Sequence, residues 1–156
     1  MEKNSPQVMT KPEYENYNKP DYESYNKLDY ENYKWDNRVV LITEDEEVNF
    51  YYLKTIFKKT EAKIIRAKNG KEAVDIIRNH HGDIDLVLMD LNMPVMDGYE
   101  AMRIIKSQHP EIPIIAQTAY TLSEDRNKCM KAGFNDYISK PINRIALFRL
   151  VNDNLS

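Results

Sequence analysis

Carboxylate, hydroxyl and amine side chains stand at the ends of four short apolar runs in this sequence. "RVVLIT" is followed by Glu44 and Asp45, "IDLVLMD" ends in Asp90, "IPIIAQT" ends in Thr118, and "FNDYIS" is followed by Lys140. If these runs are parallel strands, their carboxyl ends meet at one edge of a sheet. Three carboxylates gathered there repel one another, so a cation must offset their charge or a pKa must rise. Lys140 offsets one charge, and we expect a hard divalent cation to offset the rest.

A metal site built from a few oxygen ligands suits Mg²⁺, which keeps several waters and a near-octahedral shell. We expect Asp45 and Asp90 to be direct ligands and Glu44 to act through water, while a main-chain carbonyl after Asp90 supplies another oxygen. Mg²⁺ with open positions usually meets a phosphoryl group, and a carboxylate can attack phosphorus to form an acyl phosphate. The sequence therefore predicts phosphoryl transfer to Asp90, with Lys140 and Thr118 pairing with the phosphoryl oxygens.

The loop "LNMPVMDG" after Asp90 contains residue types that end a strand and start a helix. Pro94 opposes continuation of the strand, because proline cannot donate to a sheet ladder. Asp97 is expected to cap the next helix, and Gly98 is expected to relieve backbone strain at the start of that helix. These residue types explain why the apolar run stops abruptly at Asp90.

Strand-like and helix-like patterns alternate from Arg38 to the end of the chain. Apolar, often β-branched runs predict strands, and apolar residues at helical spacing predict helices. Five strand–helix units with short connections predict an α/β fold, in which a parallel sheet carries helices on both faces. The predicted strands are 38–43, 62–67, 84–90, 112–118 and 134–139, and the predicted helices are 48–57, 70–80, 98–108, 123–132 and 147–155.

The first 36 residues differ in composition from the rest of the chain. They contain few apolar aliphatic residues but three octapeptide repeats, "EYENYNKP", "DYESYNKL" and "DYENYKWD". They hold eight acidic residues and five lysines, and so account for the whole net charge of −3, because residues 37–156 hold seventeen acidic and seventeen basic residues. With so little to bury, residues 1–36 are predicted to form a flexible Tyr-rich tail, and residues 37–156 to form the domain. The alternative is a docking segment that orders on a partner.

The composition excludes several classes of function. A net charge of −3 over 156 residues argues against a general nucleic-acid binder. Cys129 is the only cysteine, which excludes a disulfide framework and a multi-cysteine zinc site. No apolar run approaches the length of a membrane span, and the N-terminus lacks the apolar core of a signal peptide. We therefore expect a cytoplasmic protein without membrane or direct nucleic-acid partners.

Four segments, in order along this pattern, carry a resemblance to a known family. "EDEE", "DLNMPVMDGYE", "AQTAY" and "SKPI" closely resemble the receiver domain of two-component response regulators. The resemblance covers about residues 37–155. The residues of these motifs are similar to those of receivers attached to hybrid histidine kinases. The resemblance implies a flavodoxin-like (βα)5 fold of three layers, with five parallel strands in the order 2-1-3-4-5. It also implies a cis peptide bond between Lys140 and Pro141.

The resemblance assigns a role to each residue of the predicted site. Asp90 matches the phosphoacceptor, and Lys140 matches the lysine of the family. Glu44 and Asp45 match its acidic pair. Asn92 matches the position whose main-chain carbonyl binds Mg²⁺. The implied metal site therefore consists of Glu44, Asp45, Asp90 and Asn92.

The resemblance also implies a two-state switch. Thr118 matches the switch hydroxyl, and Tyr137 matches the switch aromatic on the fifth strand. Phosphorylation of Asp90 would pull Thr118 inward and let Tyr137 rotate into the vacated space. This movement changes the face formed by the fourth helix, the fifth strand and the fifth helix. Asn92 and Tyr120 match positions that tune how fast the acyl phosphate hydrolyses.

The implied function is that of a response regulator or phosphorelay receiver. Asp90 would accept its phosphoryl group from a histidine kinase or a histidine phosphotransfer protein, and the protein would catalyse only its own phosphorylation and dephosphorylation. We expect no effector domain to follow and no kinase core to precede, so the output would run through protein contacts. One alternative is a Mg²⁺-dependent phosphohydrolase with an aspartyl-phosphate intermediate, but Asn92 occupies the position where such phosphatases place an acid. The other is a scaffold that acts through its N-terminal tail.

Overall fold

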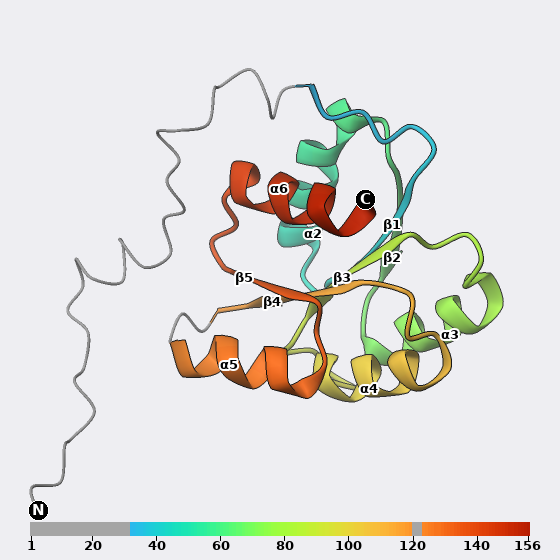
Figure 1. Ribbon diagram of the computed structural model, residues 1–156, viewed down its shortest axis with the longest axis vertical. Helices are drawn as coiled ribbons and strands as arrows, with labels where there is room; N and C mark the ends of the chain where they lie inside the picture. Colours follow the sequence, from blue (N-terminus) through green and yellow to red (C-terminus); the bar gives the residue numbers. More distant parts are fainter. Residues whose placement is uncertain (1–31, 120–122) are drawn as a thin grey trace, which may run out of the picture.

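A computed structural model of the chain describes residues 32–119 and 123–156, and it shows an α/β fold of three layers (Figure 1). All five strands are parallel and lie in the order β2-β1-β3-β4-β5. This is the predicted flavodoxin-like arrangement. The elements are β1 (Val39–Thr43), α2 (Glu47–Phe57), η3 (Lys58–Thr60), β2 (Lys63–Ala67), α3 (Gly70–His80), β3 (Leu86–Asp90), α4 (Gly98–Gln108), β4 (Ile114–Thr118), α5 (Ser123–Ala132), β5 (Asp136–Ser139) and α6 (Arg144–Leu155).

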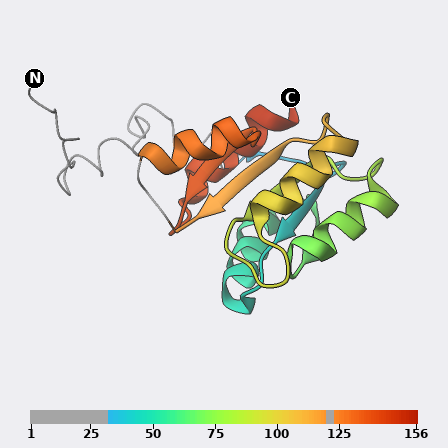
Figure 2. The ribbon, with the colours of Figure 1, turned by 90° about the horizontal axis from the view of Figure 1, so that it is seen from below.

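The sheet separates two hydrophobic cores. Helices α2 and α6 cover one face, and α3, α4 and α5 lie along the other face, as Figure 2 shows. Alternate residues of each strand enter opposite cores: Val40 and Ile42 of β1 pack toward α2 and α6, whereas Leu41 packs toward α3 and α4. All five residues of β3 and all five of β4 are buried, as the solidly apolar runs predict for central strands.

The strand register brings the carboxyl ends of the strands level at one edge of the sheet. Thr43 pairs with Met89, Asp90 pairs with Gln117, and Thr118 pairs with Ser139 across three neighbouring ladders. The polar residues that follow these ends therefore meet at this edge, as predicted from the sequence. Among residues 32–119 and 123–156, no helix has the length and apolar character needed to cross a bilayer.

The loop between β3 and α4 is held tightly against the end of β3. Asp97 caps α4 by accepting a hydrogen bond from the N–H of Glu100 at 2.9 Å, as predicted. Gly98 was predicted to relieve backbone strain, but this reason is wrong, because Gly133 is the only described glycine with a positive φ. A Cβ on Gly98 would instead meet the main-chain oxygen of Asp90 and lie 2.9 Å from the Cα of Leu91. Gly98 is needed because α4 starts in contact with the end of β3.

The packed chain begins before residue 37, which corrects the predicted start of the domain. Trp35 is only 6% exposed, and its ring lies 5.4 Å from Phe148 of α6 and 6.0 Å from Phe57 of α2, measured between centroids. Tyr33 stacks on Trp35 at 5.2 Å. The main-chain N–H of Trp35 donates to the carbonyl of Thr60 at 2.7 Å. Tyr33 and Trp35 were assigned to the flexible tail because they belong to the last repeat. Their rings instead pack together and against α6. Residues 1–31 lie outside the described residues, so for them the flexible tail stays a prediction.

Substitution Trp35→Ala tests this aromatic anchor. We expect it to lower the free energy of unfolding by about 3–5 kcal/mol, because it removes a large buried ring and leaves a cavity beside Phe57 and Phe148. Urea unfolding followed by circular dichroism measures the change, since Trp35 is the only tryptophan and its fluorescence is lost. The exposed neighbour Asp36 provides the control Asp36→Ala. If Trp35→Ala and Asp36→Ala have the same free energy of unfolding, the Trp35 ring does not anchor the segment before β1.

Substitution Gly98→Ala tests the close contact between α4 and β3. The added methyl group would push against the main chain of Asp90 and Leu91, so we expect a loss of about 1–3 kcal/mol in the free energy of unfolding. Gly82 offers a matched control, because a Cβ there meets no atom within 4 Å. Gly82→Ala should leave the unfolding midpoint close to that of the wild type. If the unfolding midpoint of Gly98→Ala also equals that of the wild type, the contact does not constrain the loop.

Candidate functional site

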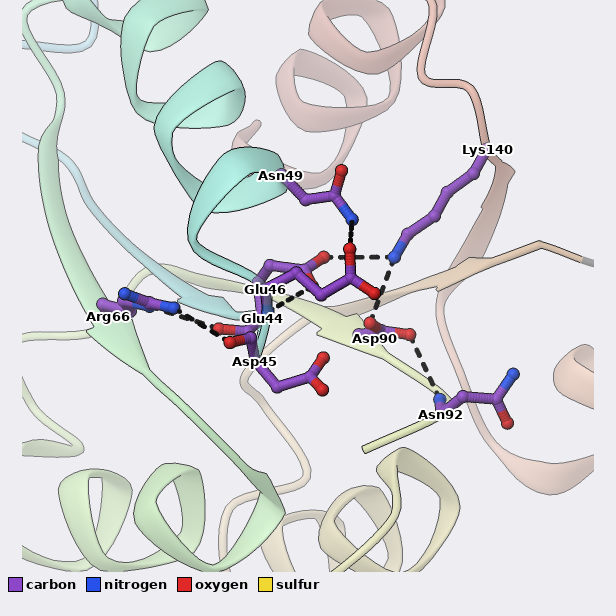
Figure 3. A network of polar contacts seen from close by, with 8 residues as sticks. All are labelled: Glu44, Asp45, Glu46, Asn49, Arg66, Asp90, Asn92 and Lys140. Carbon is purple, nitrogen blue, oxygen red and sulfur yellow. Dashed lines mark hydrogen bonds and ion pairs between the residues drawn. The ribbon is translucent and has the colours of Figure 1, made fainter. Parts of the chain in front are cut away.

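Three carboxylates from two strand ends gather at the predicted edge of the sheet. One oxygen each of Glu44, Asp45 and Asp90 lies within 4.8 Å of the others (Figure 3). Glu44 is fully buried, Asp90 is 5% exposed, and Asp45 is half-buried. Glu44 and Asp45 directly follow β1, and Asp90 ends β3, so two adjacent parallel strands position the group. The juxtaposition predicted from the sequence is confirmed.

Lys140 reaches this cluster from the end of β5. Its Nζ lies 3.1 Å from Oδ2 of Asp90 and 3.1 Å from Oε2 of Glu44, so one ammonium bridges two carboxylates (Figure 3). The main-chain N–H of Lys140 donates to the carbonyl of Thr118 at 2.7 Å, which fixes the start of the side chain. The following Lys140–Pro141 bond is cis, as predicted. Lys140 therefore lies where the predicted site requires it.

The charges of this group shift the pKa values of two of its members. Burial lowers the pKa of Lys140, but the carboxylates of Asp90 and Glu44 outweigh burial and hold that pKa above its ordinary value. Lys140 thus stays an ammonium and acts as a fixed positive charge. Burial raises the pKa of the Glu44 carboxyl, and the negative charge of Asp90 adds to this rise. The raised pKa of Glu44 thus reflects mainly the burial of this carboxyl, and Lys140 opposes the rise.

The hydrogen bonds of the three carboxylates differ. Glu44 accepts from the N–H of Glu46 at 3.1 Å and from Lys140, so both of its oxygens have partners. Asp90 accepts from Lys140 and from the main-chain N–H of Asn92 at 3.1 Å. Among the described residues, none donates a hydrogen bond to the Asp45 carboxylate or forms an ion pair with it. Asp45 is therefore the carboxylate with the most freely available oxygens.

This donor set fits a hard dication. Three carboxylates against one ammonium leave an excess of two negative charges, and the ligand atoms on offer are all oxygens. Mg²⁺ favours such ligands. Asp45 presents the oxygens best suited to direct coordination, whereas Glu44 and Asp90 each have a partner on both carboxylate oxygens. The direct role of Asp90 and the indirect role of Glu44 stay predictions. Asn92 lies beside Asp90 as predicted, and the role of its main-chain carbonyl stays a prediction.

The predicted switch residues lie on the neighbouring strands. Thr118 ends β4, is 1% exposed and pairs in register with Ser139. Tyr137 of β5 is half-buried against the core formed with α3, α4 and α5, and burial raises its pKa to about 12. Tyr120, predicted to tune hydrolysis, falls in 120–122, outside the described residues.

Two polar residues near the site were not singled out from the sequence. Arg66 of β2 contacts the segment that carries Glu44 and Asp45. Gln117 of β4 is fully buried next to Asp90, and its amide has no hydrogen-bond partner among the described residues. The signal in both cases was a polar residue within a strand that is mostly apolar, "AKIIRA" and "IPIIAQT". Such a residue needs a partner or a function.

Comparison with known proteins adds an independent observation. Residues 40–152 match the family described as Response regulator receiver domain. Hybrid signal transduction histidine kinase M of Dictyostelium discoideum is 35% identical over 117 residues, which cover 72% of this chain and 5% of the kinase. This chain therefore spans a small part of that relative.

Two solved structures share the fold and the sequence pattern. The receiver domain of sensor histidine kinase PA1611 from Pseudomonas aeruginosa, with a magnesium ion coordinated in its active site cleft, is 34% identical with a TM-score of 0.70, over 76% of this chain and 98% of that one. The receiver domain of Saccharomyces cerevisiae Ssk1, solved with the histidine phosphotransfer protein Ypd1, is 33% identical with a TM-score of 0.68, over 75% and 88%. With its acidic cluster, its bridging lysine and its strand order, the chain belongs to the family of response regulator receiver domains.

Proposed function

We propose that this receiver accepts a phosphoryl group on Asp90 from a phosphohistidine and uses it to change a protein-binding face. The donor is a histidine kinase or a histidine phosphotransfer protein. The observation that carries the proposal is the ammonium of Lys140 shared between Asp90 and Glu44, beside the carboxylate of Asp45, which has no partner among the described residues. This arrangement has the ligands for a dication and a nucleophile in one place.

The transfer step follows from the positions of these groups. A carboxylate oxygen of Asp90 attacks phosphorus, and the phosphorus–nitrogen bond of the donor breaks with its electron pair on the imidazole nitrogen. Lys140, 3.1 Å from Asp90, pairs with a phosphoryl oxygen as negative charge spreads over the group. Its raised pKa keeps it charged, so it stabilises charge and donates no proton. Asp45 and Asp90 would hold Mg²⁺, which would supply further charge neutralisation.

The response would pass through β4 and β5. Thr118 is buried at the end of β4, and Tyr137 is half-buried on β5. A phosphoryl group on Asp90 draws the Thr118 hydroxyl inward and frees space for the Tyr137 ring, so the face of α5, β5 and α6 changes shape. To move the ratio of active to inactive conformation from 1:99 to 99:1, phosphorylation must favour the active conformation by about 5.5 kcal/mol. A few charge-assisted hydrogen bonds of about 1.5–3 kcal/mol each supply that amount.

The start of α2 offers a docking surface for the phosphodonor. Val48 is 79% exposed, Tyr51 is 71% exposed and Tyr52 is 45% exposed, and all three lie on the first two turns of this helix. The helix begins two residues after Asp45, so its first turns directly follow the segment that carries two of the three carboxylates. Exposed apolar patches mark protein interaction sites. We assign this patch to the donor because a phosphohistidine must approach Asp90 closely.

Substitution Asp90→Asn tests the phosphoacceptor. Incubation of the wild-type chain with a small acyl phosphate and Mg²⁺ should add one phosphoryl group, which intact-protein mass spectrometry detects. Asp90→Asn should abolish the addition, because an amide is a far weaker nucleophile than a carboxylate. Asp97→Asn in the same loop is the control, since asparagine also caps helices and α4 stays in place. Labelling of Asp90→Asn at the wild-type level would refute the assignment.

The paired substitution Val48→Asp and Tyr51→Ala tests the docking surface. We expect phosphotransfer from a phosphorylated histidine phosphotransfer protein, with yeast Ypd1 as the probe, to slow by about tenfold or more, as for loss of an interface hot spot worth about 1.4 kcal/mol. Labelling by a small acyl phosphate should not change. Met130→Ala, which alters an exposed apolar residue on α5, is the control. If the paired variant accepts phosphoryl from Ypd1 at the wild-type rate, the donor docks elsewhere.

A further inference from the structure

Arg66 links strand β2 to the acidic segment that follows β1. Its Nε donates to the carbonyl of Glu44 at 3.2 Å, its Nη2 donates to the carbonyl of Asp45 at 3.3 Å, and its Nη1 contacts Oε1 of Glu47 at 2.6 Å. Figure 3 shows the guanidinium on one side of this segment and the carboxylate cluster on the other. The guanidinium also lies over the ring of Phe50 at 4.6 Å from the centroid. One side chain thus contacts the segment at consecutive residues and the first turn of α2.

The acidic segment has other restraints as well, among them the hydrogen bonds of the Glu44 carboxylate described above and one from Asn49 to Glu46. Glu46, at the N-cap position of α2, makes no side-chain capping hydrogen bond. The main-chain N–H of Glu44 donates to the carbonyl of Ala67 at 3.0 Å, so β2 holds the segment at this point as well. Without Arg66, the carbonyls of Glu44 and Asp45 lose their side-chain donor, while the repulsion among the three carboxylates persists.

We propose that Arg66 is a positioning residue of the metal site, which holds the backbone of Glu44 and Asp45 where their carboxylates can take Mg²⁺. The inference rests on the Mg²⁺ site of the proposed function. Arg66 touches neither the metal nor the phosphoryl group, because its donors are directed to main-chain carbonyls and to Glu47. Partners that orient metal ligands in this way are typically worth about 10–100-fold in metal affinity.

The contacts require the shape of a guanidinium as well as its charge. Three nitrogens of the planar fork reach three different oxygens, and the flat face packs on Phe50. An ammonium is a point charge and does not satisfy the two carbonyls and the Glu47 carboxylate in the same way. Arg66→Lys therefore keeps the charge but loses the fork, and we expect it to bind Mg²⁺ more weakly than the wild type.

Calorimetric titration of the full chain with Mg²⁺ tests the inference without any phosphorylation step. Arg66→Gln should raise the Mg²⁺ dissociation constant by about tenfold or more. Arg38 provides a matched control, because its guanidinium also forks between a carboxylate, Asp85 at 3.4 Å, and a carbonyl, Leu155 at 3.0 Å, with no contact to the acidic cluster. Arg38→Gln should bind Mg²⁺ like the wild type. Glu47→Gln should also stay near the wild type, because it leaves both carbonyl contacts in place.

Each result of this titration decides the inference. Wild-type affinity in Arg66→Gln, or an equal loss in Arg38→Gln, would overturn it, since the second result would report a general loss of stability. If Arg66→Gln does not fold by circular dichroism, Arg66→Lys takes its place, and weaker binding supports the fork while wild-type binding overturns it. A wild-type chain that binds no Mg²⁺ would overturn the proposed metal site itself. Weak binding confined to the Arg66 variants supports the inference.

Discussion

The mutual repulsion of three carboxylates at one edge of the sheet is the constraint on which the rest of the structure depends. Glu44, Asp45 and Asp90 approach within 4.8 Å of one another, and two of them are almost completely buried. Charges in such a place stay close only if the protein holds them and positive charge opposes them. Lys140 supplies one positive charge against three carboxylates, which leaves a shortage of positive charge at the site. The same shortage makes the site suited to a dication and to a phosphoryl group that arrives with it.

The fold meets this constraint from several directions. Parallel pairing of β1, β3, β4 and β5 brings the ligands, the hydroxyl of Thr118 and the ammonium of Lys140 to one edge. The absence of a side chain at Gly98 lets α4 start against the main chain of Asp90. Arg66 reaches in from β2, behind the acidic segment. Trp35 precedes β1, so it lies near the opposite edge of the sheet from the site, and its ring contacts with Phe57 and Phe148 join α2 and α6 there.

The sequence was most informative where chemistry and periodicity agreed. Apolar runs that end in Asp90 and Thr118 marked strands and site residues together, since hydrophobic burial alone does not require such groups at the ends of buried strands. The sequence was least informative where a residue acts through long-range packing. Trp35 lies within a polar repeat, and only the fold shows that Phe57 and Phe148 form its pocket. Periodicity also gave no sign that the partners of Arg66 are carbonyls of another segment, because main-chain acceptors have no sequence signature.

The most direct test of the central claim is the binding of beryllofluoride, a mimic of the phosphoryl group on aspartate, followed by fluorine NMR with and without Mg²⁺. We expect bound fluorine signals at one equivalent per chain when Mg²⁺ is present and none after its removal, because the excess negative charge of the cluster repels an anion until a dication offsets it. Binding of equal strength without Mg²⁺, or no binding in its presence, would contradict the claim that the crowded carboxylates gather a metal ion to prepare Asp90 for phosphorus.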